Sequence, residues 1–438
     1  MNYKIPVAPI SSYTMESVAK SDTRAAPLPF IYTPLPVIGM ADDVLDGYIN
    51  GNDPDTGKSV IGEIIDTLTK PVSSRTGEVG SKPVEVEKAA APQVLLGPDT
   101  EDNLQRLFYE KGWTDGLPVI LPTEERVKKM LAGTSHAPDE VVCQAFNMDT
   151  GERFQCTVEN IAVVAVMAGA RPEYFPVILA IAASGHSSLS PSTTAHASML
   201  MVNGPIRNEI GMNSGVGAFS PVSMANAVIG RAWTLLSISW GYAKVRKVLW
   251  SSQGNNYTYN NMCIAENEEK SVWEPLHVQK GFKADESVVS FFTGWNVLSS
   301  LHCAAHRTIG EEICLQLSVI PALNSAATIM MDPLVARTLK NNEGFTTKQD
   351  YSRWISENAM IPAERYWKTD YIDMLVASEA AKGVEPYASW KKLPDNALIN
   401  HYHNPDNVNI IVVGGESSPL WKTADYRYGS SVSVDKWR

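Results

Sequence analysis

The chain has 438 residues, of which 44% are hydrophobic and 19% charged, an ordinary mixture for one large core or two to three domains. Its net charge of -11 and pI of about 5.3 exclude a broad nucleic-acid footprint and a polybasic membrane surface, because both need excess Lys and Arg. Arg171-Pro172-Glu173 interrupts the most apolar stretch, Ile161 to Gly185, before it reaches membrane-spanning length, and no signal peptide is evident, so we expect a cytoplasmic protein.

Residues 1–97 predict an extended, proline-rich arm with one short helix at Ser59–Lys70. The segment Ala26 to Gly39, APLPFIYTPLPVIG, alternates proline with apolar residues, and proline fixes φ and removes a backbone donor. Such an arm is too apolar for a solvated linker. We expect it to lie on its own core or on a second copy of the chain, and we favour a homo-oligomer held through the arm.

Residues 98–438 predict a compact α/β or α+β region of mixed sheets flanked by helices, with two subdomains at 98–250 and 251–438 as an alternative. No internal repeat, low-complexity tract or heptad array is evident. The elements expected in chain order are helices at 99–112 and 123–133, a short strand within 113–123, helices from Thr157 and from Pro172, a strand at 198–202, a helix at 224–241, turns and strands over 251–290, helices within 293–320 and through the 330s to 380s, and a strand from Asn407.

The loop Gly204 to Pro221, GPIRNEIGMNSGVGAFSP, follows the strand at 198–202 and is rich in glycine. Glycine lets the backbone approach a ligand, and the guanidinium of an arginine suits a carboxylate or phosphate. We predict an anion site from Asn203, Arg207, Asn213, Ser214 and Gly215. The alternative is a tight turn in which Arg207 pairs with Glu209 or another acid. No nucleotide-cofactor fingerprint is present, because neither glycine loop pattern for nucleotides is complete.

Three residues near this loop are candidate catalytic groups: His196, Cys263 and Glu266. His196 could act as an acid or base, since its ordinary pKa is near neutral. Glu266 could be a general base, and Cys263 a nucleophile if a base or cation lowers its pKa. The alternatives are a histidine bonded to backbone and, for Cys263 to Glu269, a solvated acidic loop.

A metal site is suggested by His302 and His306, which share one face if residues 302–306 are helical. The zinc-protease pattern fails because Cys303 stands where its glutamate belongs. His401 and His403 could complete the ligand set. The cofactor is otherwise unknown, with a divalent transition metal as one option; the alternative is ordinary helix histidines. The five cysteines are odd in number and scattered, which predicts reduced thiols rather than a disulfide scaffold.

Five stretches together resemble a largely uncharacterised bacterial family whose members often accompany UGSC-type proteins, small proteins with a selenocysteine or cysteine motif. They are WTDGLPVILPTEERVKKML, MAGARPEYFPVILAIA, VNGPIRNEIGMNSGVGAFSPVSMANAVIGRA, CIAENEEKSVWEPLHV and IIVVGG. The resemblance covers roughly residues 100–420 and is most specific at Asn203–Gly217 and Cys263–His277. It implies no established reaction, only that a small thiol- or selenol-bearing protein is a candidate partner.

These observations predict an enzyme that acts on a small anionic or polar organic molecule, as a lyase or hydrolase with acid/base catalysis. One alternative is a metal-dependent oxidoreductase with histidine ligands. Another is a scaffolding subunit of a complex in which the partner carries the chemistry. We expect neither nucleic acid nor membrane as a partner.

Overall fold

The computed structural model describes residues 7–12, 30–34, 40–54, 56–70, 96–148, 152–243, 245, 248–300 and 306–438. It is a mixed α/β protein, as the alternation of elements in the sequence predicts. In the described part of the chain, no helix has both the length and the hydropathy needed to cross a membrane.

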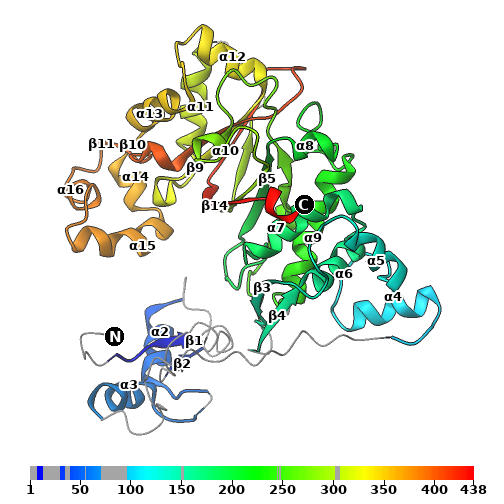
Figure 1. The fold of residues 1–438 in the computed structure, drawn as a ribbon. Helices are drawn as coiled ribbons and strands as arrows, with labels where there is room; N and C mark the ends of the chain where they lie inside the picture. The colour runs from blue at the N-terminus through cyan, green and yellow to red at the C-terminus, as the bar shows by residue number, and fades with distance from the viewer. Residues whose placement is uncertain are drawn as a thin grey trace.

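The N-terminal elements form a small unit that is set apart from the rest of the chain (Figure 1). Strands β1 (Ile10–Ser12) and β2 (Ile31–Thr33) pair in parallel, and helices α2 (Asp42–Asn50) and α3 (Val60–Thr69) contact each other. The prediction of α3 is confirmed, but the expectation of a single helix is wrong, because α2 also forms. Most of the extended segment 26–39 lies outside the described residues, and the association of copies through this arm stays a prediction.

Two four-stranded sheets form the centre of the molecule. The first has the order β14–β7–β5–β6 and the second the order β12–β9–β13–β8. Their strands are β5 (Ala197–Asn203), β6 (Ile264–Ala265), β7 (Val288–Gly294), β14 (Arg427–Ser433), β8 (Val297–Ser299), β9 (Ala327–Met331), β12 (Val408–Val412) and β13 (Trp421–Ala424).

The two sheets repeat one topology. In each, a central strand (β5 or β9) pairs in parallel with a later strand (β6 or β12) and antiparallel with the strand after that (β7 or β13). The chain then crosses to the other sheet and adds its fourth strand: β7 continues into β8, and β13 continues into β14. Each half therefore completes the sheet of the other. In the first sheet, β5 lies between β6 and β7, and β14 pairs with the outer edge of β7.

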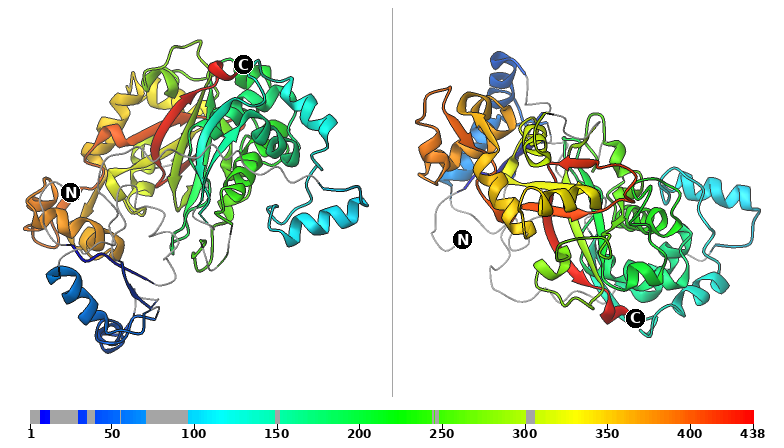
Figure 2. Two further views of the ribbon diagram at one scale, coloured as in Figure 1. Left: turned by 60° about the horizontal axis from the view of Figure 1, so that its bottom comes forward. Right: turned by 90° about the horizontal axis from the view of Figure 1, so that it is seen from above.

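Successive side chains of the central strands point to opposite faces of their sheet, and each face packs on a different layer. The order of the layers is helices, sheet, sheet, helices. On β5, Leu200 and Val202 face the helices α6 (Val158–Ala168), α7 (Phe175–Ala183) and α9 (Met224–Ser239), whereas Met199 and Met201 face the second sheet. Met330 of β9 contributes to the same inter-sheet core. The helices α11 (Ile309–Leu317), α12 (Pro333–Asn341) and α13 (Lys348–Asn358) cover the far side of the second sheet. Figure 2 shows the two helical layers on opposite sides of the strands.

Smaller units surround this body. Helices α4 (Glu101–Glu110) and α5 (Glu124–Leu131) precede the hairpin β3 (Val141–Phe146) and β4 (Arg153–Thr157), and a short α8 (Ile206–Glu209) and α10 (Leu276–Gln279) follow β5 and β6. A separate core holds β10 (Met360–Pro362), β11 (Leu398–Asn400), α14 (Ala363–Trp367), α15 (Asp370–Ala381) and α16 (Tyr387–Trp390). The strand expected within 113–123 is wrong: this segment, with prolines at 118 and 122, pairs with no strand, and Ile120 N–H instead bonds the carbonyl of Met167 at the end of α6.

Candidate functional site

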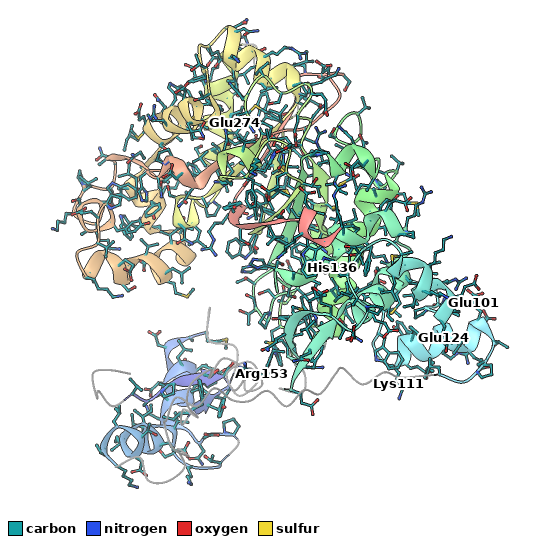
Figure 3. The ribbon with its side chains drawn as sticks, in the orientation of Figure 1. Glu101, Lys111, Glu124, His136, Arg153 and Glu274 are labelled. Atoms are coloured by element: carbon teal, nitrogen blue, oxygen red, sulfur yellow. The ribbon has the colours of Figure 1, made fainter. Side chains whose placement is uncertain are left out.

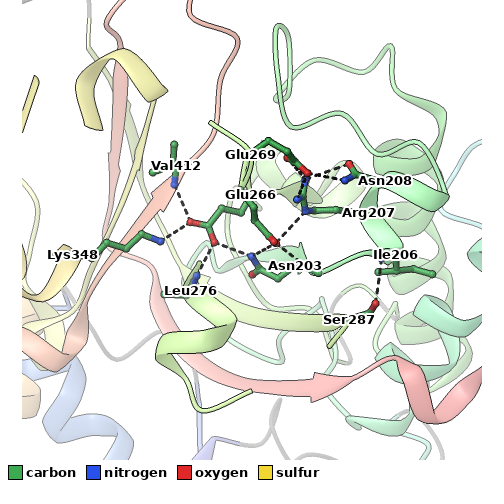
Figure 4. A network of polar contacts seen from close by, with 12 residues as sticks. Asn203, Ile206, Arg207, Asn208, Glu266, Glu269, Leu276, Ser287, Lys348 and Val412 are labelled. Atoms are coloured by element: carbon green, nitrogen blue, oxygen red, sulfur yellow. Dashed lines mark hydrogen bonds and ion pairs between the residues drawn. The ribbon is translucent and has the colours of Figure 1, made fainter. Parts of the chain in front are cut away.

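Glu266 is the centre of a buried polar network at the carboxyl ends of β5, β6 and β12 (Figure 4). Its Oε1 accepts a hydrogen bond from the Lys348 Nζ at 2.6 Å and one from the Val412 N–H at 3.3 Å. Its Oε2 accepts from the Asn203 Nδ2 and the Leu276 N–H, both at 2.8 Å. Glu266 is fully buried and Lys348 nearly so, and the four donors occupy both carboxylate oxygens.

The charge of Glu266 is stabilised by this network. Burial raises the pKa of the carboxyl, but attraction to the Lys348 ammonium and the hydrogen bond from the Leu276 N–H outweigh burial, so the net shift is downward. A general base needs a lone pair that can reach a substrate proton. Both oxygens of Glu266 point at protein donors, so the group holds elements together in this structure.

Arg207, on α8, is held by two neighbouring acids. Its Nη1 and Nη2 donate to the two carboxylate oxygens of Glu269 at 2.8 and 2.6 Å, a bidentate pair, and its Nε lies 3.1 Å from the Glu268 carboxylate. Glu209 pairs instead with Arg438. The guanidinium thus meets the protein's own carboxylates, which is the alternative that the sequence left open beside an anion site.

Asn203 joins the two parts of the network, because its Nδ2 donates both to Glu266 and to Glu268. Glu268 also accepts from the Gly204 N–H at 2.8 Å, and Gly204 has a φ of +81° with no room for a Cβ beside the Glu286 carbonyl. The structure therefore brings together Asn203, Arg207 and Glu266 of the predicted site, as one closed cluster.

Asn213, Ser214 and Gly215 shape a turn. Asn213 Oδ1 accepts from the Gly215 N–H at 2.9 Å, and the Asn213 N–H is bound by the side chain of Asn226. The Ser214 carbonyl accepts from the Gly414 N–H at 2.9 Å, so this turn packs on the turn after β12. The amides of Asn213 and Gly215 are thus bound within the protein rather than exposed to a ligand.

A pocket of about 280 Å³ lies beside the second part of the glycine-rich loop, and we name it the loop pocket. Its wall combines this loop, the start of α9, the segment before β6 and the edges of β8 and β13. The lining residues are Ala218, Phe219, Ser220, Pro221, Asn226, Ala227, Asn256, Tyr257, Tyr259, Met262, Cys263, Ile264, Val297 and Lys422. Residues of both sheets meet here, so the two halves of the chain build one concave surface.

Lys422 of β13 is the charged residue of this wall. It is half-buried, its Nζ donates to the Ser299 Oγ at 2.5 Å, and the ring of Phe219 lies 5.4 Å from the Nζ. Burial lowers the pKa of Lys422. Within the described residues, no carboxylate forms an ion pair with it.

Cys263 also lines the loop pocket, but burial raises the pKa of its thiol to about 12, which keeps it protonated near neutral pH. A thiol in that state is a poor nucleophile. A smaller pocket of about 60 Å³ lies elsewhere, against His401 and Arg365.

His196 lies away from Glu266. It directly precedes β5 whereas Asn203 ends it, and a strand of this length separates them by roughly 20 Å. The ring packs edge-on against Trp295 with 4.3 Å between ring centroids, its Nδ1 is buried without a partner, and burial lowers the pKa of the imidazole. It is absent from the lining of the loop pocket.

Of the two histidines predicted to bind a metal, His302 and His306, the structure describes only His306. His302 lies outside the described residues, and His306 is exposed at the start of the next described segment. Among the described residues, no group of three or more His, Cys, Asp and Glu side chains is arranged to hold a metal ion.

Sequence reasoning missed Lys348 and Lys422. Lys348 opens α13 in a polar stretch, TTKQD, that is typical of an exposed helix start, so no local signal marks it as buried. Lys422 carried a weak signal, because it is a lone lysine between apolar residues in LWKTA. The acids that pair with Arg207 lie in a segment that the sequence analysis singled out, since Glu268 and Glu269 end the acidic run after Cys263.

Comparisons with known proteins do not assign the chain to a family. No family model matches the chain, and no curated protein or solved structure does either. The resemblance to the bacterial family and the thiol- or selenol-bearing partner therefore stay predictions, and function must be argued from the loop pocket and its charges.

Proposed function

We propose that the chain is an enzyme that acts on a small anionic or polar organic molecule, and that this molecule binds in the loop pocket. The observation that carries the proposal is Lys422: a half-buried ammonium on the wall of a pocket, with a hydroxyl and an aromatic ring beside it and no acid paired to it among the described residues. Burial removes water from the ammonium, and no carboxylate replaces that water. An anion bound in the pocket would therefore offset the unfavourable free energy of the buried charge.

The rest of the wall suits a small organic anion. Tyr257, Met262, Val297 and Phe219 offer apolar surface, and Asn256 and Ser220 offer polar atoms. This is the usual composition of a ligand site, in which a few polar groups orient a molecule against apolar walls. The volume fits a compact molecule rather than a dinucleotide.

We infer lyase- or hydrolase-type acid/base catalysis with Lys422 as the group that moves the proton. Burial lowers the pKa of Lys422, so this lysine gives up its proton more readily than an exposed lysine does. We assign this role to Lys422 instead of Glu266, whose oxygens are occupied, and His196, which lies outside the pocket lining.

Thermal-shift measurements with short carboxylates, sugar phosphates and inorganic phosphate test binding. We expect some of these compounds to raise the Tm of the wild type and to have little effect on Lys422→Met. Lys280→Met is the matched control, because Lys280 is also half-buried over an aromatic ring, Tyr428 at 4.4 Å, and has a lowered pKa, yet it does not line the pocket.

Compounds that bind are then incubated with the protein and followed by NMR, where gain or loss of water or of a small fragment identifies a hydrolase or lyase. An equal Tm shift in wild type and Lys422→Met would overturn the site. If Lys422→Met does not fold, Lys422→Gln takes its place. Binding without turnover of any bound compound would count against the enzyme and favour a binding protein.

A further inference from the structure

Two of the five cysteines, far from the loop pocket, face each other across a hairpin. Cys143 of β3 and Cys156 of β4 are register partners in an antiparallel pair, next to an irregularity of the ladder between Val141 and Cys143. Directly opposite residues of such a pair have Cα atoms about 4.5–5.5 Å apart, within the range of about 4.4–6.8 Å seen in disulfides. Both are free thiols here, Cys156 buried and Cys143 partly exposed.

We propose that Cys143 and Cys156 form a reversible redox pair that closes to a disulfide across the β3–β4 hairpin when the chain meets a small hydroperoxide. The sequence does not suggest this pair, since its cysteines are scattered and lack a CxxC motif. The pairing follows from strand register, which places residues 13 positions apart side by side.

The proximity of the two thiols affects them differently. Interaction with Cys143 lowers the pKa of Cys156, whereas interaction with Cys156 and burial raise the pKa of Cys143. Cys156 is therefore the group that forms a thiolate first, and the thiolate is the form that reacts with peroxides.

The reaction balances with one equivalent of hydrogen peroxide. The Cys156 thiolate attacks one peroxide oxygen, the O–O bond breaks, and hydroxide leaves, so that Cys156 becomes a sulfenic acid. The Cys143 sulfur then loses its proton and attacks the Cys156 sulfur, and the sulfenic oxygen leaves as water. The sum is two thiols and one peroxide giving one disulfide and two waters, and a dithiol reductant reverses it.

The other two described cysteines, Cys263 and Cys314, serve as internal controls for the reactivity of Cys156. Cys263 and Cys314 are buried, and burial raises the pKa of each thiol to about 12, so both hold little thiolate near neutral pH. Peroxide that reacts according to thiolate content should therefore modify Cys156 before either of them.

The hairpin is tied to the body at both ends, so its closure would fix a defined element. Thr157, directly after Cys156, caps α6, and the Met148 N–H bonds the Trp240 carbonyl at the end of α9. A disulfide would join the strands between these two anchors, and we expect it to raise the Tm of the chain.

A non-reducing peptide map tests the pair directly. Arg153 lies between the two cysteines, near the end of the hairpin (Figure 3), so trypsin separates them into two peptides unless a disulfide links them. After mild peroxide treatment and alkylation of the remaining thiols, we expect the linked peptide mass, two hydrogen atoms below the sum, and its loss after reduction.

Variants and a second measurement decide the outcome. Cys143→Ser should lose the linked mass and leave Cys156 as a sulfenic acid that a dimedone-type probe labels, and Cys314→Ser should behave as wild type. Unlinked, fully alkylated Cys143 and Cys156 peptides at peroxide levels that already oxidise Cys263 or Cys314 would overturn the proposal. So would a linked peptide that contains Cys303 in place of either partner.

Discussion

Lys348 and Glu266 form an ion pair that joins two distant parts of the chain. Lys348 begins α13, on the outer side of the second sheet, and Glu266 directly follows β6 of the first. The distance of 2.6 Å and the burial of both side chains mean that neither charge has water to replace its partner.

Removing one partner should therefore be costly. We expect Glu266→Gln to lower the free energy of unfolding by about 3–5 kcal/mol, because the Lys348 ammonium would stay buried without a counter-charge. Urea denaturation measures the change. The double variant Glu266→Gln/Lys348→Met should recover much of the loss, and a double variant as unstable as the single one would contradict this account.

Glu269 predicts a pH dependence. Its hydrogen bond with Arg207 lowers the pKa of the carboxyl from an ordinary 4.5 to about 2. Since the folded pKa lies below the unfolded one, the pair stabilises the chain above about pH 5, and this contribution is lost as the pH falls toward 2.

Glu269→Gln should consequently flatten the fall in stability between pH 5 and pH 2 relative to wild type. Denaturation midpoints across this range measure the slope. Glu357→Gln, on an exposed part of α13, is the control and should keep the wild-type slope. Because Glu269 is more than half exposed, we expect the effect to weaken in high salt.

At the scale of elements, local signals predicted helix starts well. Thr123 and Thr157 accept hydrogen bonds from helix N–H groups as the N-caps of α5 and α6. A cap depends on three or four consecutive residues, so sequence suffices to find it. The β3–β4 hairpin was missed, because its strands are short and mixed in polarity.

The contact between two turns decides the shape of the glycine-rich loop. Gly415 follows β12, and a Cβ at this position would lie 2.1 Å from the Val216 Cγ2 and 2.4 Å from the Val216 nitrogen. The close approach of the two backbones thus requires glycine at 415.

Gly415→Ala should push the loop away from this turn and deform the loop pocket, whose wall begins two residues after Val216. We expect a loss of about 1–3 kcal/mol in the free energy of unfolding and weaker Tm shifts with compounds that bind the wild type. Gly47→Ala, in α2, is the control, because a Cβ there meets no atom within 4 Å and alanine favours a helix. An unchanged Tm shift in Gly415→Ala would show that the loop position does not matter for binding.

At the scale of the whole molecule, the exchange of strands makes the two halves depend on each other. Asp425 lies where β13 crosses toward β14, and its carboxylate accepts from the Trp295 N–H at 2.7 Å and from the Asn296 N–H at 2.9 Å. Trp295 and Asn296 connect β7 to β8, so one buried side chain joins both crossings.

Asp425→Ala should therefore destabilise both sheets together, by about 3 kcal/mol, since it leaves several donors without a partner. Urea denaturation should show a single transition at a lower midpoint. Asp373→Ala, which breaks an exposed pair with Lys391, is the control and should change stability by less than about 1 kcal/mol. Two separate transitions in Asp425→Ala would mean that the halves fold independently.

The amino-acid sequence by itself determined what depends on neighbours along the chain: the mixed α/β class, most helices and the central buried strand at 198–202. These follow from periodicity, capping and turn chemistry. Only the tertiary structure decided the topological repeat, the closure of Arg207 by Glu268 and Glu269, the burial of Lys348, the pairing of Cys143 with Cys156 and the place of Lys422 in a pocket. Each of these depends on strand register or on the crossing of strands between sheets, which brings together residues such as Phe219 and Lys422, 203 positions apart. Hydrophobic pattern alone does not encode which strands become neighbours.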